Sequence, residues 1–243
     1  MRVGCLTSPK SRLLVRLLFL GVLVCAALAV IGDFTGLASR WQPAWSLWFG
    51  LGEEKNVPAA YSTFLLAVPA ALLLLIAFRV RRDGSEPVLP WLLLGVGFLV
   101  MAVDEFFSLH ENLTLPTAQF LVSCGFSPGH FGPLAFAWVV PGLGLVVALG
   151  VFFQRFLVRL SRETRSRFLV AAGVYLSGVL LMEMVGAWYF ESVGKIDGRY
   201  MALSQIEEVL EMSGMILFIR ALLLEIQRRD SMEPEGSWPV AGR

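Results

Sequence analysis

Six long apolar segments constrain this chain more than any other feature. Each is long enough to cross the roughly 30 Å hydrocarbon layer of a bilayer as a helix of about 20 residues. We predict these spans at residues 13–31, 57–78, 88–109, 131–156, 168–190 and 201–226. Of the 243 residues, 56% are hydrophobic and 16% are charged, a composition unlike that of soluble domains. We therefore expect an all-α polytopic membrane protein with a bundle of six transmembrane helices.

Basic residues predict the orientation, because Lys and Arg accumulate in the cytoplasmic loops of membrane proteins. Threading six spans through the membrane places sixteen of the 20 Lys and Arg on the side of the N-terminus. Both termini are then cytoplasmic. We expect one transmembrane domain over residues 1–229, a disordered cytoplasmic tail over 230–243, and location in the inner (plasma) membrane of a bacterial cell.

The first apolar segment has a second interpretation. Arg12 and Arg16 precede it, and Ala27-Leu28-Ala29 resembles the small-residue cleavage site of a secretory signal peptide. The run is longer than the usual apolar region of a signal peptide, so we favour a retained helix.

Charge and cysteine content exclude several kinds of partner. The net charge of +1 gives no reason to expect nucleic acid. The three cysteines, Cys5, Cys25 and Cys124, have no paired spacing and indicate neither disulfides nor a thiolate metal site. The lipid bilayer is the expected partner, together with a lipid-linked or small-molecule substrate, and the oligomeric state is left open.

Acidic residues concentrate at the outer ends of the predicted spans. An ionisable side chain at membrane depth is costly and is by default a candidate functional group. The predicted topology brings acids of the third, fifth and sixth spans to one level of the membrane. These acids are Asp104, Glu105, Glu111, Glu183, Glu207, Glu208 and Glu211.

Helical spacing divides the third span into faces. Asp104, Ser108 and Glu111 stand at i, i+4 and i+7 and so form one stripe of a continuous helix. His110 lies off this stripe, and it joins the acids only if the helix loosens near its end.

The sixth span carries a similar stripe of Glu207, Glu211 and Gly214, which we expect to face the stripe of the third span. The glycine would let a neighbouring helix approach closely. Glu207 and Glu208 also suit the first turn of a helix, where the dipole favours acids.

Carboxylates gathered in a low dielectric require a neutralising partner, because like charges oppose one another's ionisation. Lys and Arg are nearly absent from this region, which leaves protons or cations. Oxygen ligands favour Mg²⁺, Ca²⁺ or Mn²⁺, with zinc or iron as further possibilities. A di-iron site is disfavoured because neither His110 nor His130 follows a Glu by three residues. The predicted metal ligands are Asp104, Glu111, Glu183, Glu207 and Glu211, and the predicted catalytic acid and base groups are Glu105, His110 and Glu208.

Four pieces of sequence carry a resemblance to known proteins. They are Glu54-x-Asn56-x-Pro58-x-x-Tyr61-Ser62, Asp104-Glu105-x-x-Ser108-Leu109-His110-Glu111, Glu183-Met184 and Glu207-Glu208-x-x-Glu211-Met212-x-Gly214. Together the chain resembles bacterial multi-pass membrane proteins of uncharacterised function. The resemblance implies the architecture and supplies no activity. A looser similarity joins it to membrane hydrolases that hold a metal among seven helices, although this chain lacks their paired-histidine helix.

Three functions remain open at this stage. In a metal-dependent enzyme, activated water would attack a lipid-linked ester or phosphate in the outer leaflet. A proton- or cation-coupled transporter could use the same acids. Against it, no acidic partner was identified in the inner halves of the spans, where Arg220 is the nearest candidate and is expected to snorkel to the headgroups. In a structural or assembly protein, the acids would only hydrogen-bond between helices.

Overall fold

The fold was analysed in a computed structural model, which describes residues 9–34, 45, 47–53, 55–84 and 86–231. These residues form helices and turns, with no β-strand among them, so the predicted all-α class is confirmed. The helices are α1 Pro9–Phe34, α3 Val57–Asp83, α4 Leu89–Phe107, η1 Leu109–Leu113, α5 Thr114–Ser123, η2 Gly132–Leu134, α6 Val139–Arg159, α7 Arg162–Leu176, η3 Ser177–Met182, α8 Glu183–Val193 and α9 Gly198–Asp230.

Within the described part of the chain, five helical stretches are long and apolar enough to cross a membrane. They are Pro9–Gly32, Val57–Asp83, Leu89–Phe107, Val139–Arg159 and Arg162–Val193. Only 11% of the most apolar window of α6 is buried inside the protein, so its apolar side chains face outward, as lipid contact requires. The chain is a multi-pass membrane protein. The sixth predicted span, α9, is not among these five, because acids and arginines interrupt its apolar sequence.

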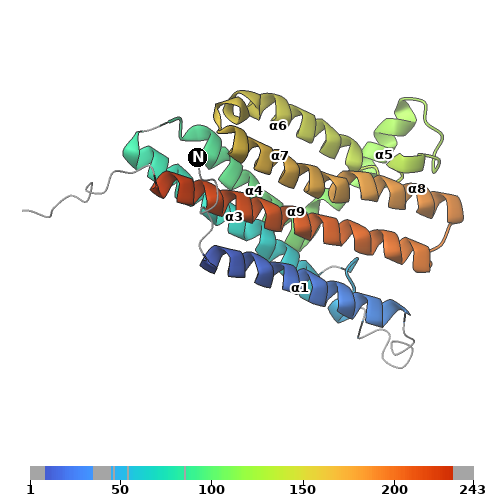
Figure 1. The fold of residues 1–243 in the computed structure, drawn as a ribbon. Helices are drawn as coiled ribbons and strands as arrows, with labels where there is room; N and C mark the ends of the chain where they lie inside the picture. The colour runs from blue at the N-terminus through green and yellow to red at the C-terminus, as the bar shows by residue number, and fades with distance from the viewer. Residues whose placement is uncertain (1–8, 35–44, 46, 54, 85, 232–243) are drawn as a thin grey trace, which may run out of the picture.

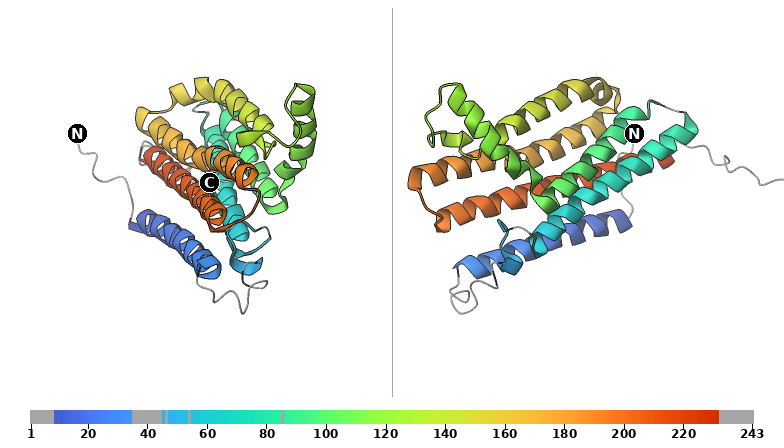
Figure 2. Two further views of the ribbon diagram at one scale, coloured as in Figure 1. Left: turned by 90° about the vertical axis from the view of Figure 1, so that its right-hand side faces the viewer. Right: turned by 180° about the vertical axis from the view of Figure 1, so that it is seen from behind.

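Helix α9 occupies the middle of the bundle (Figures 1 and 2). It packs against α1 on one side and α7 on the other, and it also contacts α3 and α8. Helices α3 and α4 form a closely packed pair. Residues in the C-terminal half of α9 such as Ile219 and Leu222 are fully buried. The acids and arginines of α9 are therefore carried by a helix that packs against four others.

Local sequence explains where α3 begins and how α1 is held. The Asn56 side chain accepts a hydrogen bond from the Ala59 backbone N–H at 3.0 Å and donates to the Gly50 carbonyl at 2.6 Å. An N-cap of this kind satisfies a backbone donor at the helix start. The Tyr61 hydroxyl donates to the Leu18 carbonyl of α1 at 2.7 Å. This part of the family motif therefore has a structural role.

An apolar cluster around Trp91 holds together the end of the bundle where α4 and α7 begin. Its ring packs edge-on against Phe156 at 4.9 Å and Phe168 at 6.4 Å, and Phe218 stacks on Phe98 at 4.9 Å. Offset and edge-on aromatic contacts add stability beyond the burial of apolar surface. The cluster joins α4, α6, α7 and α9.

Several predicted boundaries were wrong. The predicted third span ran to residue 109, but α4 ends at Phe107 because Ser108 adopts a left-handed conformation with φ of 50°. The predicted fourth span began at residue 131, whereas α6 begins at Val139 after a turn that contains Pro133. Between the third and fourth predicted spans, for which no helix was predicted, the chain forms the helix α5. Residues 232–243 of the predicted disordered tail lie outside the described residues.

Candidate functional site

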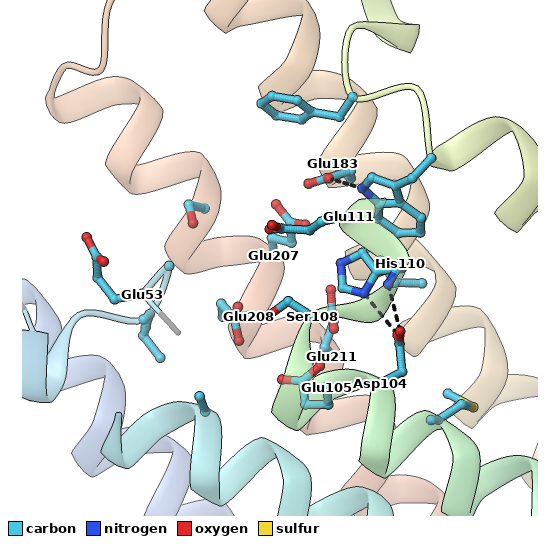
Figure 3. Close-up of a pocket in the computed structure, with 18 of the residues that line it drawn as sticks. Glu53, Asp104, Glu105, Ser108, His110, Glu111, Glu183, Glu207, Glu208 and Glu211 are labelled. Carbon is cyan, nitrogen blue, oxygen red and sulfur yellow. Dashed lines mark hydrogen bonds and ion pairs between the residues drawn. The ribbon is translucent and has the colours of Figure 1, made fainter. Parts of the chain in front are cut away.

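A single cavity brings together the eight residues that were predicted to form the site (Figure 3). Its volume is about 550 Å³, within the range of ligand pockets. Asp104 and Glu105 come from α4, His110 and Glu111 from η1, and the others from α8 and α9. The predicted residues that line it are Asp104, Glu105, His110, Glu111, Glu183, Glu207, Glu208 and Glu211.

The end of α4 brings His110 against Asp104. Because Ser108 is left-handed, the chain leaves the α-helix and continues as the short 3₁₀-helix η1. The His110 backbone N–H donates to Asp104 Oδ1 at 2.8 Å, and His110 Nδ1 lies 2.9 Å from Asp104 Oδ2. The helix thus loosens near its end, as the sequence analysis required for His110 to join the acids. The continuous stripe predicted for Asp104, Ser108 and Glu111 was wrong, although all three line the cavity.

Asp104 also sets the charge state and orientation of His110. Burial acts to lower the pKa of His110, but the hydrogen bond to Asp104 and the nearby carboxylates outweigh burial, so the pKa lies above its ordinary value of 6.5. A carboxylate bonded to one ring nitrogen fixes the imidazole and leaves the other nitrogen available.

Trp138 connects the histidine to the far wall. Its indole lies against the His110 ring with centroids 4.6 Å apart, and its Nε1–H donates to Glu183 Oε1 at 2.8 Å. The Glu183 carboxyl also lies close enough to Glu207 for the two charges to interact. Two carboxyl groups this close cannot both be ionised without a proton or a cation between them.

Five glutamates, Glu105, Glu183, Glu207, Glu208 and Glu211, form what we term the glutamate cluster. Charge interactions connect each of the five to at least one other member. Figure 3 shows them converging from α4, α8 and α9. The cluster therefore carries strong mutual repulsion unless something positive enters it.

Close helix contacts hold Glu207 and Glu211 opposite Glu183. A Cβ atom at Gly178 would lie 2.6 Å from Glu211 Cγ and 2.8 Å from the Glu207 carbonyl oxygen, and one at Gly214 would lie 2.5 Å from the Tyr175 backbone nitrogen. The predicted close approach at Gly214 is confirmed. It faces α7, however, and does not line the cavity with Glu207 and Glu211. Gly178 belongs to the π-helical segment η3, a feature often found at functional sites.

Several lining residues were missed by sequence reasoning. Trp138, Tyr175 and Tyr200 supply aromatic walls, but aromatic residues in apolar segments are usually assigned to the core or to the lipid interface. Glu53 also lines the cavity, although it precedes α3 and lies outside the predicted spans. The exposed His130 does not line the cavity, and Glu191 instead accepts hydrogen bonds from the backbone of Phe131 and Gly132 at 2.9 and 2.8 Å.

The lining has a single sign of charge. Among the described residues that line the cavity, eight are acidic and none is Lys or Arg. No group of three or more His, Cys, Asp or Glu side chains in the described part is arranged to hold a metal ion directly. The cavity therefore offers many carboxylates at its walls and no preformed tight coordination shell.

The cavity is closed on the inner side by packed residues. Leu65, Met212 and Met215 are almost fully buried beneath Glu105 and Glu211. Farther inward lies one acid that the sequence reasoning overlooked, Glu225, with 1% exposure. It accepts hydrogen bonds from Thr164, Arg228 and Arg229, so its charge is already neutralised within the fold.

Comparison with known proteins identifies a family and no characterised relative. No curated protein and no solved structure matches the chain. The profile described as "Domain of unknown function (DUF8692)" matches residues 17–226, which include every residue predicted for the site. The predicted membership of an uncharacterised family is thus confirmed, and the chain belongs to the DUF8692 family.

Proposed function

We propose that this protein is a six-span bacterial inner-membrane protein whose outward-facing cavity binds a hydrated divalent cation. The observation that carries the proposal is the lining of eight acidic residues without a basic one. Mg²⁺ retains several waters and commonly binds proteins through only one or two carboxylates. A wide cavity without a tight ligand group suits such an ion, and Ca²⁺ or Mn²⁺ of the same oxygen preference. It suits zinc less well, because zinc takes three or four direct protein ligands.

The orientation is part of the proposal. With α9 as the sixth span, both termini are cytoplasmic and the cavity opens to the outside, in agreement with the sixteen-to-four distribution of basic residues. The 33 residues of α9 give a helix of about 50 Å, which is more than a span requires. Its enclosure by α1, α3, α7 and α8 supports a spanning helix that tolerates polar residues.

The glutamate cluster is the proposed binding wall. Glu183, Glu207 and Glu211 face one another across the contact of α8 and α9, and Glu111 completes the predicted ligands from η1. Asp104 was predicted as a ligand, but both its oxygens are engaged by His110, so we assign it the role of orienting the imidazole. Glu105, Glu208 and His110 are then the groups that can exchange protons.

The proposed chemistry is hydrolysis of a lipid-linked ester or phosphate from the outer leaflet. A cation held by Glu183, Glu207 and Glu211 would lower the pKa of a water and so would supply a nucleophile near neutral pH. An imidazole held by a carboxylate can accept or return the proton. The apolar wall of Leu51, Met101 and Val179 offers a surface for the lipid portion of such a substrate.

Two alternatives are less well supported. A carrier needs a path to the other side, but packed residues close the cavity floor and the inner acid Glu225 is already paired. A purely structural role does not explain a cavity of about 550 Å³ lined by carboxylates, because their mutual repulsion would destabilise the fold.

Binding of Mn²⁺ tests the proposal, because free Mn²⁺ gives an electron paramagnetic resonance signal that weakens when the ion binds. Purified wild type should bind Mn²⁺, and Mg²⁺ should compete. The double variant Glu207→Gln/Glu211→Gln should bind at least roughly tenfold more weakly, since two ligand charges are lost. The matched control is Glu163→Gln, an exposed glutamate outside the cavity. Equal Mn²⁺ binding by wild type and the double variant would refute the site.

A further inference from the structure

A second, smaller cavity lies farther along α9, nearer the C-terminal end of this helix than the glutamate cluster. It is a crevice of about 170 Å³ between the first turns of α1 and the inner half of α9. The two helices run antiparallel there, since Gln227 of α9 reaches Ser11 of α1 at 3.4 Å. The crevice is lined by Ser11, Arg12, Val15, Arg16, Arg220, Leu223 and Leu224.

The crevice combines three guanidinium groups with an apolar wall. Arg12 and Arg16 are one helical turn apart on α1, and Arg220 approaches from α9. All three are exposed. The crevice lining contains no acidic residue. Among the described residues, none of these three arginines forms an ion pair. The nearby acid Glu225 is already bound to Arg228 and Arg229.

Depth makes the unpaired charge of Arg220 significant. It lies ten residues before Asp230, the last residue of α9, which is about 15 Å along the helix. Its neighbours Leu217 and Leu223 are apolar. An arginine below the headgroup level is costly unless it snorkels or meets an anion. Guanidinium groups bind phosphate through two parallel hydrogen bonds.

We propose that this crevice binds the phosphate of an anionic phospholipid from the cytoplasmic leaflet. Basic pockets between membrane helices on the cytoplasmic side are suited to anionic headgroups. Val15, Leu223 and Leu224 offer contact for the adjoining acyl chain. The inference rests on the proposed orientation of the chain and is independent of cation binding in the outer cavity. Under this proposal Arg12, Arg16 and Arg220 bind a lipid phosphate, whereas the sequence analysis expected only that Arg220 would snorkel to the headgroups.

Native mass spectrometry of the full chain, released from detergent after addition of lipid, tests the proposal. Wild type should retain one molecule of phosphatidylglycerol in preference to phosphatidylcholine, which has the same phosphate but no net charge. The variant Arg16→Gln/Arg220→Gln should lose this retention by roughly thirtyfold, because each basic residue near the surface contributes to anionic lipid binding. Arg155→Gln/Arg159→Gln is the matched control, since both arginines are exposed near the inner end of α6.

Further arms separate the remaining explanations. Arg16→Lys/Arg220→Lys should keep part of the retention, which shows that a loss in the glutamine variant reflects charge and not misfolding. Inorganic phosphate should not displace the lipid at millimolar concentration. Equal retention of both lipids, equal retention by wild type and the glutamine variant, or displacement by free phosphate would each overturn the proposal.

Discussion

His110 Nδ1 lies 2.9 Å from Asp104 Oδ2 although six residues separate them in the sequence. Residues six apart on a continuous α-helix point in different directions, because each residue turns the helix by about 100°. The left-handed Ser108 ends α4 between the two and returns the chain toward Asp104. The backbone conformation of a single serine therefore creates the histidine–carboxylate pair of the cavity.

Ser108 should accordingly tolerate glycine but not a β-branched residue. A left-handed conformation costs an L-residue about 1–2 kcal/mol and more when the side chain is branched. Ser108→Val should lower the free energy of unfolding by about 2 kcal/mol, and Ser108→Gly should stay within about 1 kcal/mol of wild type. Thermal unfolding in detergent, followed by circular dichroism, measures both. Equal stability of the two variants would contradict the assigned strain.

The contact between α7 and α9 should be sensitive to one methyl group. Gly214→Ala places Cβ 2.5 Å from the Tyr175 backbone nitrogen, so the helices must separate, and we expect a loss of about 1–3 kcal/mol. Gly173→Ala is the control on α7, because a Cβ there meets nothing within 4 Å. It should be neutral or slightly stabilising, since alanine is the better helix former. The same unfolding assay distinguishes them, and a neutral Gly214→Ala would show that the helices are not in contact there.

Glu225 should be essential for the stability of the C-terminal end of α9. Its side chain is 0% exposed and pairs with Arg228 at 2.6 Å and Arg229 at 2.8 Å. Glu225→Gln leaves these arginines without their buried partner, and we expect a loss of about 3 kcal/mol. Glu163→Gln removes an exposed glutamate from an i,i+4 pair with Arg167 and should cost under about 0.5 kcal/mol. Similar unfolding midpoints for the two variants would argue against the buried network.

Acid should weaken the start of α9 through Asp197. Hydrogen bonds from the Tyr200 backbone, the Tyr189 hydroxyl and the Arg199 backbone hold the pKa of Asp197 below its ordinary 3.8. A lowered folded-state pKa gives stability that is present above the unfolded pKa and is lost as pH falls through the folded pKa. Wild type should therefore exceed Asp197→Asn in stability at pH 6, and the difference should shrink below about pH 4. A difference that is constant with pH would exclude this contribution of the Asp197 charge.

Periodicity and charge predicted much of the fold and of the cavity lining. Long apolar runs predicted the helical class, and the restriction of Asp104, Glu183 and Glu207 to one level of the membrane predicted that they would meet. These signals succeed because burial and topology are properties of whole segments. The role of each acid as a ligand or a proton carrier stays a prediction.

Local backbone departures and aromatic contacts escaped prediction. Ser108 carries no sequence signal for a left-handed conformation, so the stripe through Glu111 was drawn on a helix that ends earlier. Trp138 was passed over because its hydrogen bond to Glu183 depends on the packing of the segment around η2 against α8, which no local pattern encodes. Glu225 was overlooked although its ionic partners Arg228 and Arg229 follow it by three and four residues. Of its hydrogen bonds, the one from Thr164 joins residues 61 positions apart.

The π-helical segment Ser177–Met182 changes the phase of the helix that contains it. Tyr175 and Glu183 are eight residues apart, which would place them about 80° from each other on an uninterrupted α-helix. With one residue taken up by the wider turn, the spacing becomes equivalent to seven residues, or about 20°, and both side chains line the same cavity. Helical-wheel projections of this stretch should therefore be drawn in two halves. In an alignment with relatives that lack the wider turn, a one-residue gap belongs between 177 and 182, because loss of one residue there keeps Glu183 in phase with Tyr175.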